Sequence, residues 1–323
     1  MKIVIPGGSG QVGTILARAF QKDGHAVVVL SRSASKAPWR VVTWDAATVG
    51  PWAREIDGAD VVINLAGRSV NCRYTPRNRE SIKQSRVLST RVVGEAIAAA
   101  TRPPRVWLQA STATIYAHRY DAPNDEATGI VGGSEPDAPE TWRFSIDVAS
   151  SWERELDNAR VPGTRKVKLR SAMTMSPDQG GIFETLLTLV RRRLGGRAGD
   201  GRQYVSWVHE LDFVRALYWL IDHHEVAGAV NIAAPDPLPN AAFMSDLRHA
   251  CGISVGLPAS KWMLEIGAVF MRTETELILK SRRVVPGLLA ERGFTFQFPR
   301  WREAAKDLYR RWREQNGRVQ RAA

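Results

Sequence analysis

Hydrophobic positions along the chain form short apolar runs separated by longer segments of helical periodicity. The first run, 2–5, precedes a glycine-rich turn and an amphipathic segment from Thr14 to Phe20. A second long segment, 78–100, carries apolar residues at helical spacing and stops at Pro103-Pro104. Short buried strands that alternate with helices predict an α/β fold built on a doubly wound parallel sheet. The predicted strands are 2–5, 26–30, 40–43, 60–65, 105–110 and 166–170.

The glycines between the first strand and the first helix have the spacing of a phosphate-binding turn. Gly8, Gly10 and Gly13 fit the pattern GxGxxG, and Gly7, Gly10 and Gly13 fit a looser version with glycines three apart. Such a turn brings the backbone close to a pyrophosphate, and the helix N-terminus offers N–H groups to it. A purely structural turn is the alternative. The residues predicted to hold the phosphates are Gly7, Gly10, Gln11, Val12 and Gly13.

Beyond residue 170 the pattern changes to shorter and more varied elements. They are a helix over 180–194, a flexible loop over 195–201, a strand over 204–208, helices over 240–251 and 261–280, a short strand over 293–299 and a terminal helix over 301–313. Aromatic residues expected to pack in a core or against a lobe are Trp262, Phe270, Phe294, Phe296, Phe298 and Trp301. We therefore expect a Rossmann domain over 1–165 that also receives later strands. Substrate-lobe segments over 166–240 would interleave with it, and 241–323 would form a C-terminal helical domain.

The end of the second strand predicts which dinucleotide is bound. An NAD site usually carries an Asp or Glu about 20 residues after the glycines, where it binds the adenosine ribose. Here Ser31, Arg32 and Ser33 occupy that point, and Lys36 follows. An arginine can pair with a 2′-phosphate, and the serines can donate to it, so NADP is the expected cofactor. An exposed loop arginine without a ligand is the alternative.

Other residues at the carboxyl ends of the predicted strands are candidates for cofactor contact. Asp45 follows the third strand, where it could reach the adenine edge or could instead cap a turn with Ala46 and Ala47. Small residues after the fourth strand would let the backbone approach the ligand. Hydroxyl groups after the fifth strand, Ser111 among them, would face the nicotinamide half of the cofactor. The residues after the fourth strand are Leu65, Ala66 and Gly67.

Three motifs taken together carry a family resemblance: the glycine turn, Asn64-Leu65-Ala66-Gly67 and Ser111-Thr112-Ala113-Thr114-Ile115-Tyr116. They resemble extended or atypical short-chain dehydrogenases/reductases, the NAD-dependent epimerase/dehydratase group. Over nearly the whole chain the sequence is similar to epimerase-family proteins that carry an extra C-terminal domain of unknown function. The segments of that closer similarity are Ser85-Arg86, Trp152-Glu153, Gly195-Gly196, 199–203, 206–209, 231–235 and 281–286.

The resemblance implies a hydride-transfer site with an unusual proton-transfer residue set. Related enzymes use a Tyr-x-x-x-Lys pair as acid and base, and a Ser or Thr that polarises the substrate oxygen. Thr112 matches that hydroxyl, whereas Ser145 and Ala149 occupy the tyrosine and lysine positions. Tyr116 is a candidate substitute, although a buried tyrosine that anchors a loop is the alternative. The sequence thus predicts an NADP-dependent oxidoreductase or epimerase-like enzyme for a small organic substrate, or else a non-catalytic NADP-binding sensor or scaffold.

The remaining polar candidates are expected to be structural or exposed to solvent. His118 and the pair Asp125-Glu126 are expected to be exposed rather than catalytic. Asp212 is expected to cap a helix that starts at Phe213, with His209 packed beside it. The basic loop that contains Arg197 and Arg202 could bind an anionic substrate group. The histidine, cysteine and carboxylate spacings give no metal site.

Composition excludes several other classes of protein. The chain has a net charge of +12, with arginines concentrated near the C-terminus. Those arginines alternate with Glu303, Asp307 and Glu314, so a solvated basic face is expected rather than a nucleic-acid interface. Cys72 and Cys251 are expected to be free thiols in a reducing cytoplasm. We expect no signal peptide and no membrane partner, while the pattern leaves assembly into a homo-oligomer open.

Overall fold

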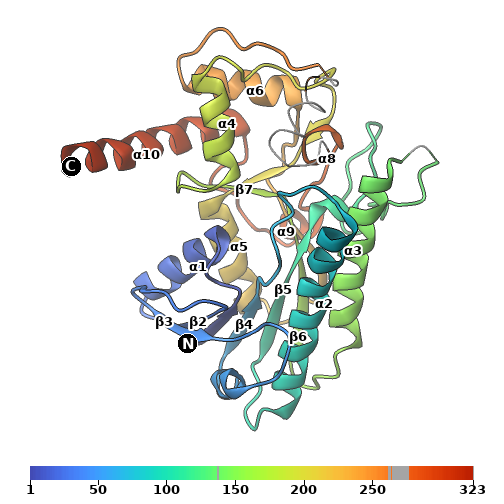
Figure 1. Ribbon diagram of the computed structural model, residues 1–323, viewed down its shortest axis with the longest axis vertical. Helices are drawn as coiled ribbons and strands as arrows, with labels where there is room; N and C mark the ends of the chain where they lie inside the picture. Colours follow the sequence, from blue (N-terminus) through green and yellow to red (C-terminus); the bar gives the residue numbers. More distant parts are fainter. Residues whose placement is uncertain (137, 261–262, 264–275, 323) are drawn as a thin grey trace. The chain divides into compact units, whose positions relative to one another are not determined.

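The computed structural model describes residues 1–136, 138–260, 263 and 276–322 (Figure 1). The chain forms two compact units, each built from three segments. Unit 1 comprises Met1–Ile115, Pro136–Ser171 and Val214–Val230. Unit 2 comprises Tyr116–Glu135, Ala172–Phe213 and Asn231–Ala323. No helix in the described ranges is long and apolar enough to cross a lipid bilayer.

A seven-stranded sheet with strand order β10-β6-β5-β4-β1-β2-β3 forms the core of the fold. The pairs β1·β2, β2·β3, β1·β4, β4·β5 and β5·β6 are all parallel. This is the doubly wound arrangement predicted from the apolar runs, in which the order of connection reverses between β1 and β4. The sequence did not predict β10. The strands are β1 (Lys2–Pro6), β2 (Ala26–Ser31), β3 (Arg40–Thr43), β4 (Val61–Asn64), β5 (Val106–Thr112), β6 (Arg165–Ser171) and β10 (Gly228–Ile232).

Long helices cover the sheet of unit 1. Helices α2 (Pro76–Ala99) and α3 (Glu140–Asn158) lie side by side (Figure 1). Val4 and Val62 of the sheet, Val92 of α2 and the buried Trp107 belong to one hydrophobic cluster. Helix α1 (Gln11–Lys22) packs beside α5 (Glu210–Asp222), where the rings of Phe20 and Tyr218 meet edge to face at 4.9 Å. Because helices shield the sheet, the central strands β1, β2 and β4 read as nearly continuous apolar runs.

Unit 2 has a separate hydrophobic core centred on aromatic residues. The Trp301 side chain is fully buried. Its ring stacks on that of Phe243, with 4.0 Å between the ring centres, and its ring centre lies 5.0 Å from that of Trp207. Its indole N–H donates to the Phe243 carbonyl at 2.9 Å, which satisfies the polar atom of the ring. The elements are β7 (Met173–Met175), α4 (Ile182–Arg191), β8 (Tyr204–Val205), β9 (Trp207–His209), β11 (Leu238–Pro239), α6 (Asn240–Ala250), α8 (Glu276–Leu279), α9 (Gly287–Glu291) and α10 (Trp301–Ala322).

Several predicted elements of unit 2 differ from the structure. The strand predicted over 204–208 is two short strands, β8 and β9, which pair in different sheets with β11 and β7. Residues 293–299 contain no strand, and α10 extends past the predicted end at 313. The loop 195–201 is tied by backbone hydrogen bonds to residues 257–259. Most of the helix predicted over 261–280 lies outside the described residues, as do Trp262 and Phe270.

His209 and Asp212 connect the start of α5 to later parts of unit 2. The His209 Nδ1 atom accepts the Leu211 N–H at 3.1 Å, and Nε2 lies 3.2 Å from the Asp307 carboxylate of α10. The expected capping role of Asp212 is wrong, because α5 begins at Glu210 and places Asp212 in its first turn. Its carboxylate instead accepts the backbone N–H groups of residues 297 and 298, at 2.8 and 2.7 Å.

Burial of His209 predicts a pH dependence of stability. Burial lowers the pKa of His209 to about 4, which outweighs the attraction of Asp307. Between pH 6.5 and 4 the unfolded chain therefore binds a proton that the folded chain does not, so the free energy of unfolding falls as the pH is lowered. We expect urea unfolding to show a loss of about 2 kcal/mol between pH 7.5 and pH 5. His209→Asn removes the titrating group, and an unchanged pH slope in that variant would refute the assignment.

Candidate functional site

The glycine turn between β1 and α1 is held by two backbone contacts that exclude a side chain. Gly7 has φ +74°, and a Cβ atom there would lie 2.5 Å from the Cα atom of Ala66. A Cβ atom on Gly13 would lie 2.4 Å from the Cα and carbonyl oxygen of Gly8. Heavy atoms cannot approach so closely without a shift of the backbone, so both positions require glycine. The turn therefore packs directly against the loop after β4 and against the first turn of α1.

Gly10 differs from the other glycines because it borders open space. It is the N-cap of α1, and a Cβ atom there would meet no protein atom within 4 Å. Gln11 and Val12 are the first residues of α1, whose first-turn N–H groups lack acceptors within the helix. No acidic residue lies in this first turn. The positive end of the helix dipole thus adjoins open space, where a bound anion would be stabilised.

A cavity of about 470 Å³ runs from the glycine turn to the end of β2. Arg32 lines it and is exposed, and among the described residues no ion pair or hydrogen bond holds its guanidinium. Ser31 is buried, and its hydroxyl accepts the Ser33 N–H at 3.3 Å. Lys36 adds a second cation to the wall. The remaining lining residues are Gly8, Ser9, Thr14, Val29, Ser35, Ala37, Pro38, Trp39 and Val41.

Asp45 holds the turn that follows β3. Its carboxylate accepts the backbone N–H groups of Ala47 and Thr48, each at 2.9 Å, and the Thr48 hydroxyl at 2.5 Å. These hydrogen bonds lower the pKa of Asp45 to about 2. The neighbouring Ala46 adopts a positive φ of 63° inside the turn. The turn-capping alternative is therefore present in the structure, and contact with an adenine stays a prediction.

A buried pair of amides supports the loop after β4. Asn64 and Gln109, from adjacent strands, are bonded from Nδ2 to Oε1 at 3.0 Å. The Asn64 Oδ1 atom accepts the Ala66 N–H at 3.1 Å, and the Leu65 N–H bonds to the Pro6 carbonyl at 2.8 Å. The loop that includes Gly67 is thereby fixed beside the glycine turn. Sequence reasoning missed this pair because a single buried amide carries no periodic signal.

At the end of β5, Ser111 belongs to a buried ionic cluster. Its hydroxyl donates to the Glu153 carboxylate at 2.6 Å. Arg170 of β6 binds the same carboxylate through two hydrogen bonds of 2.8 Å, from Nε and Nη2. The Ser111 side chain is thus engaged with α3, which leaves its backbone as the group that could meet a cofactor. The similarity of Trp152-Glu153 to related proteins did not by itself reveal this role.

Thr112 is the polar side chain that ends β5. Its hydroxyl oxygen accepts the Thr114 N–H at 3.1 Å, and the residue is only partly buried. A hydroxyl that accepts one hydrogen bond still has its own proton to donate. On α3, which packs beside the short helix η2 (Ala113–Ile115), Ser145 is partly buried and Ala149 is fully buried.

Tyr116, assigned to unit 2, has a buried hydroxyl. The side chain is 2% exposed, and its hydroxyl donates to the Asn231 Oδ1 atom at 2.9 Å. Asn231 also bonds through Nδ2 to the Val285 carbonyl at 2.9 Å. This is the loop-anchoring arrangement that the sequence offered as the alternative to catalysis.

Other polar residues of unit 2 have structural partners. The expected exposure of His118 is wrong: it is partly buried, its Nδ1 accepts the Ser281 N–H at 2.8 Å, and burial lowers its pKa. The expected exposure of Glu126 is wrong as well: it is partly buried, it accepts the backbone N–H groups of Asn231 and Leu288 at 2.7 and 3.1 Å, and burial raises its pKa. Asp125 holds a turn through the N–H groups of residues 127 and 128.

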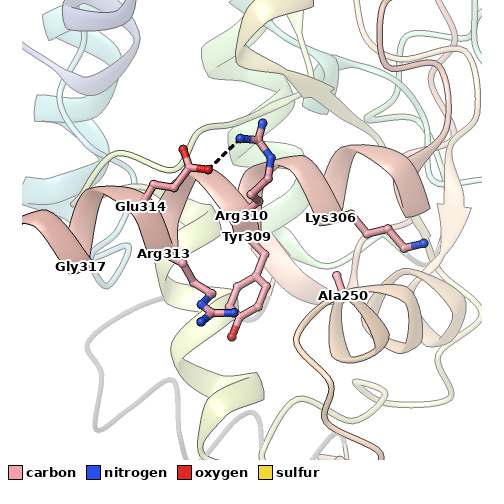
Figure 2. Close-up of a pocket in the computed structure, with 7 residues that line it drawn as sticks. All are labelled: Ala250, Lys306, Tyr309, Arg310, Arg313, Glu314 and Gly317. Carbon is pink, nitrogen blue, oxygen red and sulfur yellow. Dashed lines mark hydrogen bonds and ion pairs between the residues drawn. The ribbon is translucent and has the colours of Figure 1, made fainter.

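A second hollow, of about 650 Å³, lies along α10 in unit 2 (Figure 2). Lys306, Arg310 and Arg313 line it together with Glu314, which pairs with Arg310 at 2.9 Å. Arg310 also pairs with an aspartate of α10, at 2.5 Å. The charge of Arg310 is therefore balanced within the helix. Across the described ranges no cluster of His, Cys, Asp and Glu could hold a metal ion.

Fold and site together define a dinucleotide-binding protein of the doubly wound class. Residues 3–233 match the model of the NAD dependent epimerase/dehydratase family, and residues 259–308 match a domain of unknown function, DUF1731. The chain belongs to the NAD dependent epimerase/dehydratase family.

Individual relatives resemble the chain over almost its full length. It is 28% identical to the human epimerase family protein SDR39U1 over 95% of this chain and 99% of that protein. The bovine protein of the same name is 30% identical over the same shares. A crystal structure of human SDR39U1 (isoform 2) with NADPH superimposes with a TM-score of 0.81 at 27% identity, over 95% and 99% of the two chains. A nucleoside-diphosphate sugar epimerase from Corynebacterium glutamicum gives a TM-score of 0.72 at 28% identity, over 94% of this chain and 57% of that one.

Proposed function

We propose that this protein is an NADP-dependent oxidoreductase or epimerase-like enzyme that acts on a small organic substrate. The observation that carries the proposal is the cavity lined by Arg32, directly after β2, and by Lys36, with no carboxylate among its lining residues. A cationic wall suits the 2′-phosphate of NADP, and it remains compatible with the other groups of the dinucleotide. The human relative whose structure holds NADPH supports the same choice of cofactor.

The residues around the glycine turn would hold NADP in an extended form. The diphosphate would bind at the N-terminus of α1, in the space that Gly10 borders. Ser31 and Arg32 would bind the 2′-phosphate, and Asp45 would lie near the adenine. Backbone groups at the ends of β4 and β5 would contact the nicotinamide half of the cofactor. The proposed cofactor residues are Gly7, Gly10, Gln11, Val12, Gly13, Ser31, Arg32, Asp45, Leu65, Ala66, Gly67 and Ser111.

Bound NADP supplies hydride transfer at its nicotinamide ring. Thr112 would polarise the substrate oxygen. Its hydroxyl oxygen accepts the Thr114 N–H, so the hydroxyl proton remains available to donate to a ligand. Tyr116 is given a structural role, since its own proton is committed to Asn231. Water would carry the proton, because Ser145 and Ala149 occupy the positions where related enzymes have the Tyr-x-x-x-Lys pair.

The residues at positions 145 and 149 also favour a second candidate function. A serine and an alanine supply neither the acid nor the lysine that lowers its pKa. The alternative is a non-catalytic NADP-binding sensor or scaffold, in which bound NADP alters a conformation or an interaction. Both functions require the same cofactor site, so they are distinguished by turnover.

The first experiment is a titration of cofactor-free protein with NADPH and with NADH, followed by nicotinamide fluorescence. Tighter binding of NADPH supports the proposed cofactor, and binding of neither refutes the function. NADPH oxidation is then measured with a panel of carbonyl compounds. Turnover supports the enzyme, whereas tight binding without turnover of any compound favours the sensor.

Thr112→Val tests the catalytic assignment. Valine keeps the shape of threonine and removes the hydroxyl, so we expect kcat for carbonyl reduction to fall about 100-fold, with NADPH affinity unchanged. Thr112→Ser retains the hydroxyl and should recover most of the activity. Equal turnover in the valine variant and the wild type would remove Thr112 from the mechanism.

A further inference from the structure

Arg86 of α2 is a partly buried cation held in one orientation by neutral groups. Its Nη1 atom donates to the carbonyls of Arg68 and Ile82, both at 3.0 Å. The guanidinium carbon lies 5.0 Å from the centre of the Trp152 ring, in cation–π geometry. These contacts fix the plane of the guanidinium without neutralising its charge.

The charge of Arg86 has no carboxylate partner. Within the described residues no acidic side chain lies at ion-pair distance from it. Burial lowers the pKa of Arg86 to about 10, and nearby Tyr74 offsets part of this effect, so the group stays protonated at neutral pH. By contrast, Arg91 on the same helix pairs with Glu155 at 2.9 Å. A desolvated cation without a counter-ion is unfavourable unless a ligand supplies the anion.

Arg86 lies beside the predicted ligand site of unit 1. A Cβ atom on Gly67 would lie 3.2 Å from the Arg86 guanidinium carbon. Ala66, the preceding residue, lies beside Gly7 of the glycine turn, since a Cβ atom on Gly7 would be 2.5 Å from its Cα atom. No protein acceptor in the described part of the chain binds the Nε and Nη2 hydrogens of Arg86.

The neighbouring residue, Ser85, supports the same loop as Arg86 but carries no charge. Its hydroxyl accepts the Arg68 N–H at 2.9 Å, whereas Arg86 binds the Arg68 carbonyl. Consecutive residues of α2 therefore clamp one residue of the loop that follows Gly67. Of these two residues, Ser85 is neutral and Arg86 carries a positive charge.

We propose that Arg86 is an anion receptor, which binds a carboxylate or phosphate group of the ligand held beside Gly67. A guanidinium presents parallel N–H groups that match the two oxygens of such a group. The anion has two sources that share this chemistry: the diphosphate of the cofactor, or an acidic group of the substrate itself. The second source would make the substrate an anionic carbonyl compound. The inference rests on the proposed function, because it places Arg86 in the same site.

The test compares Arg86→Gln with three other variants: Arg86→Lys, Ser85→Ala and Arg91→Gln. NADPH affinity is measured by fluorescence. Binding of inorganic phosphate or oxalate is measured by the rise in Tm at saturating NADPH, where the cofactor already fills its own phosphate sites. Urea unfolding checks that each variant folds. Arg86→Lys keeps the charge and should retain part of the anion binding. Ser85→Ala controls for support of the loop, and Arg91→Gln controls for loss of a surface charge.

We expect Arg86→Gln to weaken NADPH at least 10-fold if the cofactor supplies the anion. If the substrate supplies it, NADPH binding is kept and the Tm rise with phosphate or oxalate is lost. Wild-type behaviour of Arg86→Gln in both assays would overturn the proposal, as would an equal loss in Ser85→Ala, which would indicate loop support alone. A wild-type protein that binds no NADPH would instead refute the proposed function.

Discussion

Replacing Gly13 by alanine is expected to destabilise the protein and to abolish NADPH binding together. The added Cβ atom would lie 2.4 Å from backbone atoms of Gly8, and backbone cannot yield as a flexible side chain can. Overpacking of this kind costs about 1–3 kcal/mol. The shift would move α1 away from the glycine turn, so NADPH affinity should fall at least 100-fold. Urea unfolding and fluorescence titration measure the two effects.

Gly10→Ala is the matched control, because its Cβ atom would meet no protein atom within 4 Å. The backbone there has φ −79° and ψ 175°, which alanine adopts readily. Stability should change by less than about 0.5 kcal/mol. NADPH affinity should still fall at least 10-fold, since the new methyl group would occupy the proposed diphosphate space. Full NADPH affinity in Gly10→Ala would show that no diphosphate binds at this turn.

Arg32→Ala is expected to reduce discrimination between the two nicotinamide cofactors. Loss of a charge-assisted hydrogen bond to the 2′-phosphate should weaken NADPH by about 1.5–3 kcal/mol. NADH lacks that phosphate, so its affinity should change little. Because Arg32 is exposed and has no partner among the described residues, the substitution should leave stability unchanged. Separate titrations with NADPH and NADH give the ratio.

Lys36→Ala serves as the comparison for Arg32, since both cations line the same cavity. A lysine acts as a point charge, so its removal should weaken NADPH less than removal of the arginine. Equal weakening of NADPH and NADH in Arg32→Ala would mean that Arg32 does not recognise the 2′-phosphate. The cationic wall would then be a general attraction for anions.

The sheet of unit 1 could be predicted because its strands are buried by helices. Residues 26–30 are wholly apolar, 105–110 are apolar except for Arg105 and Gln109, and glycine or proline lies in the segments around them. The missed strand, β10, is the sheet edge next to β6. Its sequence, Gly228–Ile232, is short and mixes apolar residues with Asn231, so no strong pattern marked it.

Predictions for unit 2 failed where long-range partners decide the structure. Residues 204–208 form one apolar run, yet β8 and β9 pair with different strands. Asp212 had the spacing of a helix cap, but its acceptors are filled by N–H groups 85 and 86 residues away. His118 was expected in solvent because its neighbours in sequence are polar, whereas its partner is Ser281. Local sequence carries no information about such partners.

In the candidate site, too, features set by local sequence could be predicted and features set by distant residues could not. The glycine turn was predicted from spacing, and the contacts of Gly7 and Gly13 give that spacing its physical reason. The engagement of Ser111 with Glu153 could not be predicted, because the two residues lie 42 positions apart. Arg86 was marked only by similarity to related proteins, since one arginine in a polar helix has no distinguishing pattern.

The late position of β10 in the chain has a consequence for synthesis. The ribosome delivers β6, which ends at Ser171, long before it delivers Gly228–Ile232. Until then the outer side of β6 presents unpaired N–H and C=O groups, which attract other strands. About 57 further residues, most of them belonging to unit 2, must therefore be made before β10 can pair with β6. Nascent chains of this protein are thus most exposed to misassociation and chaperone capture over that interval.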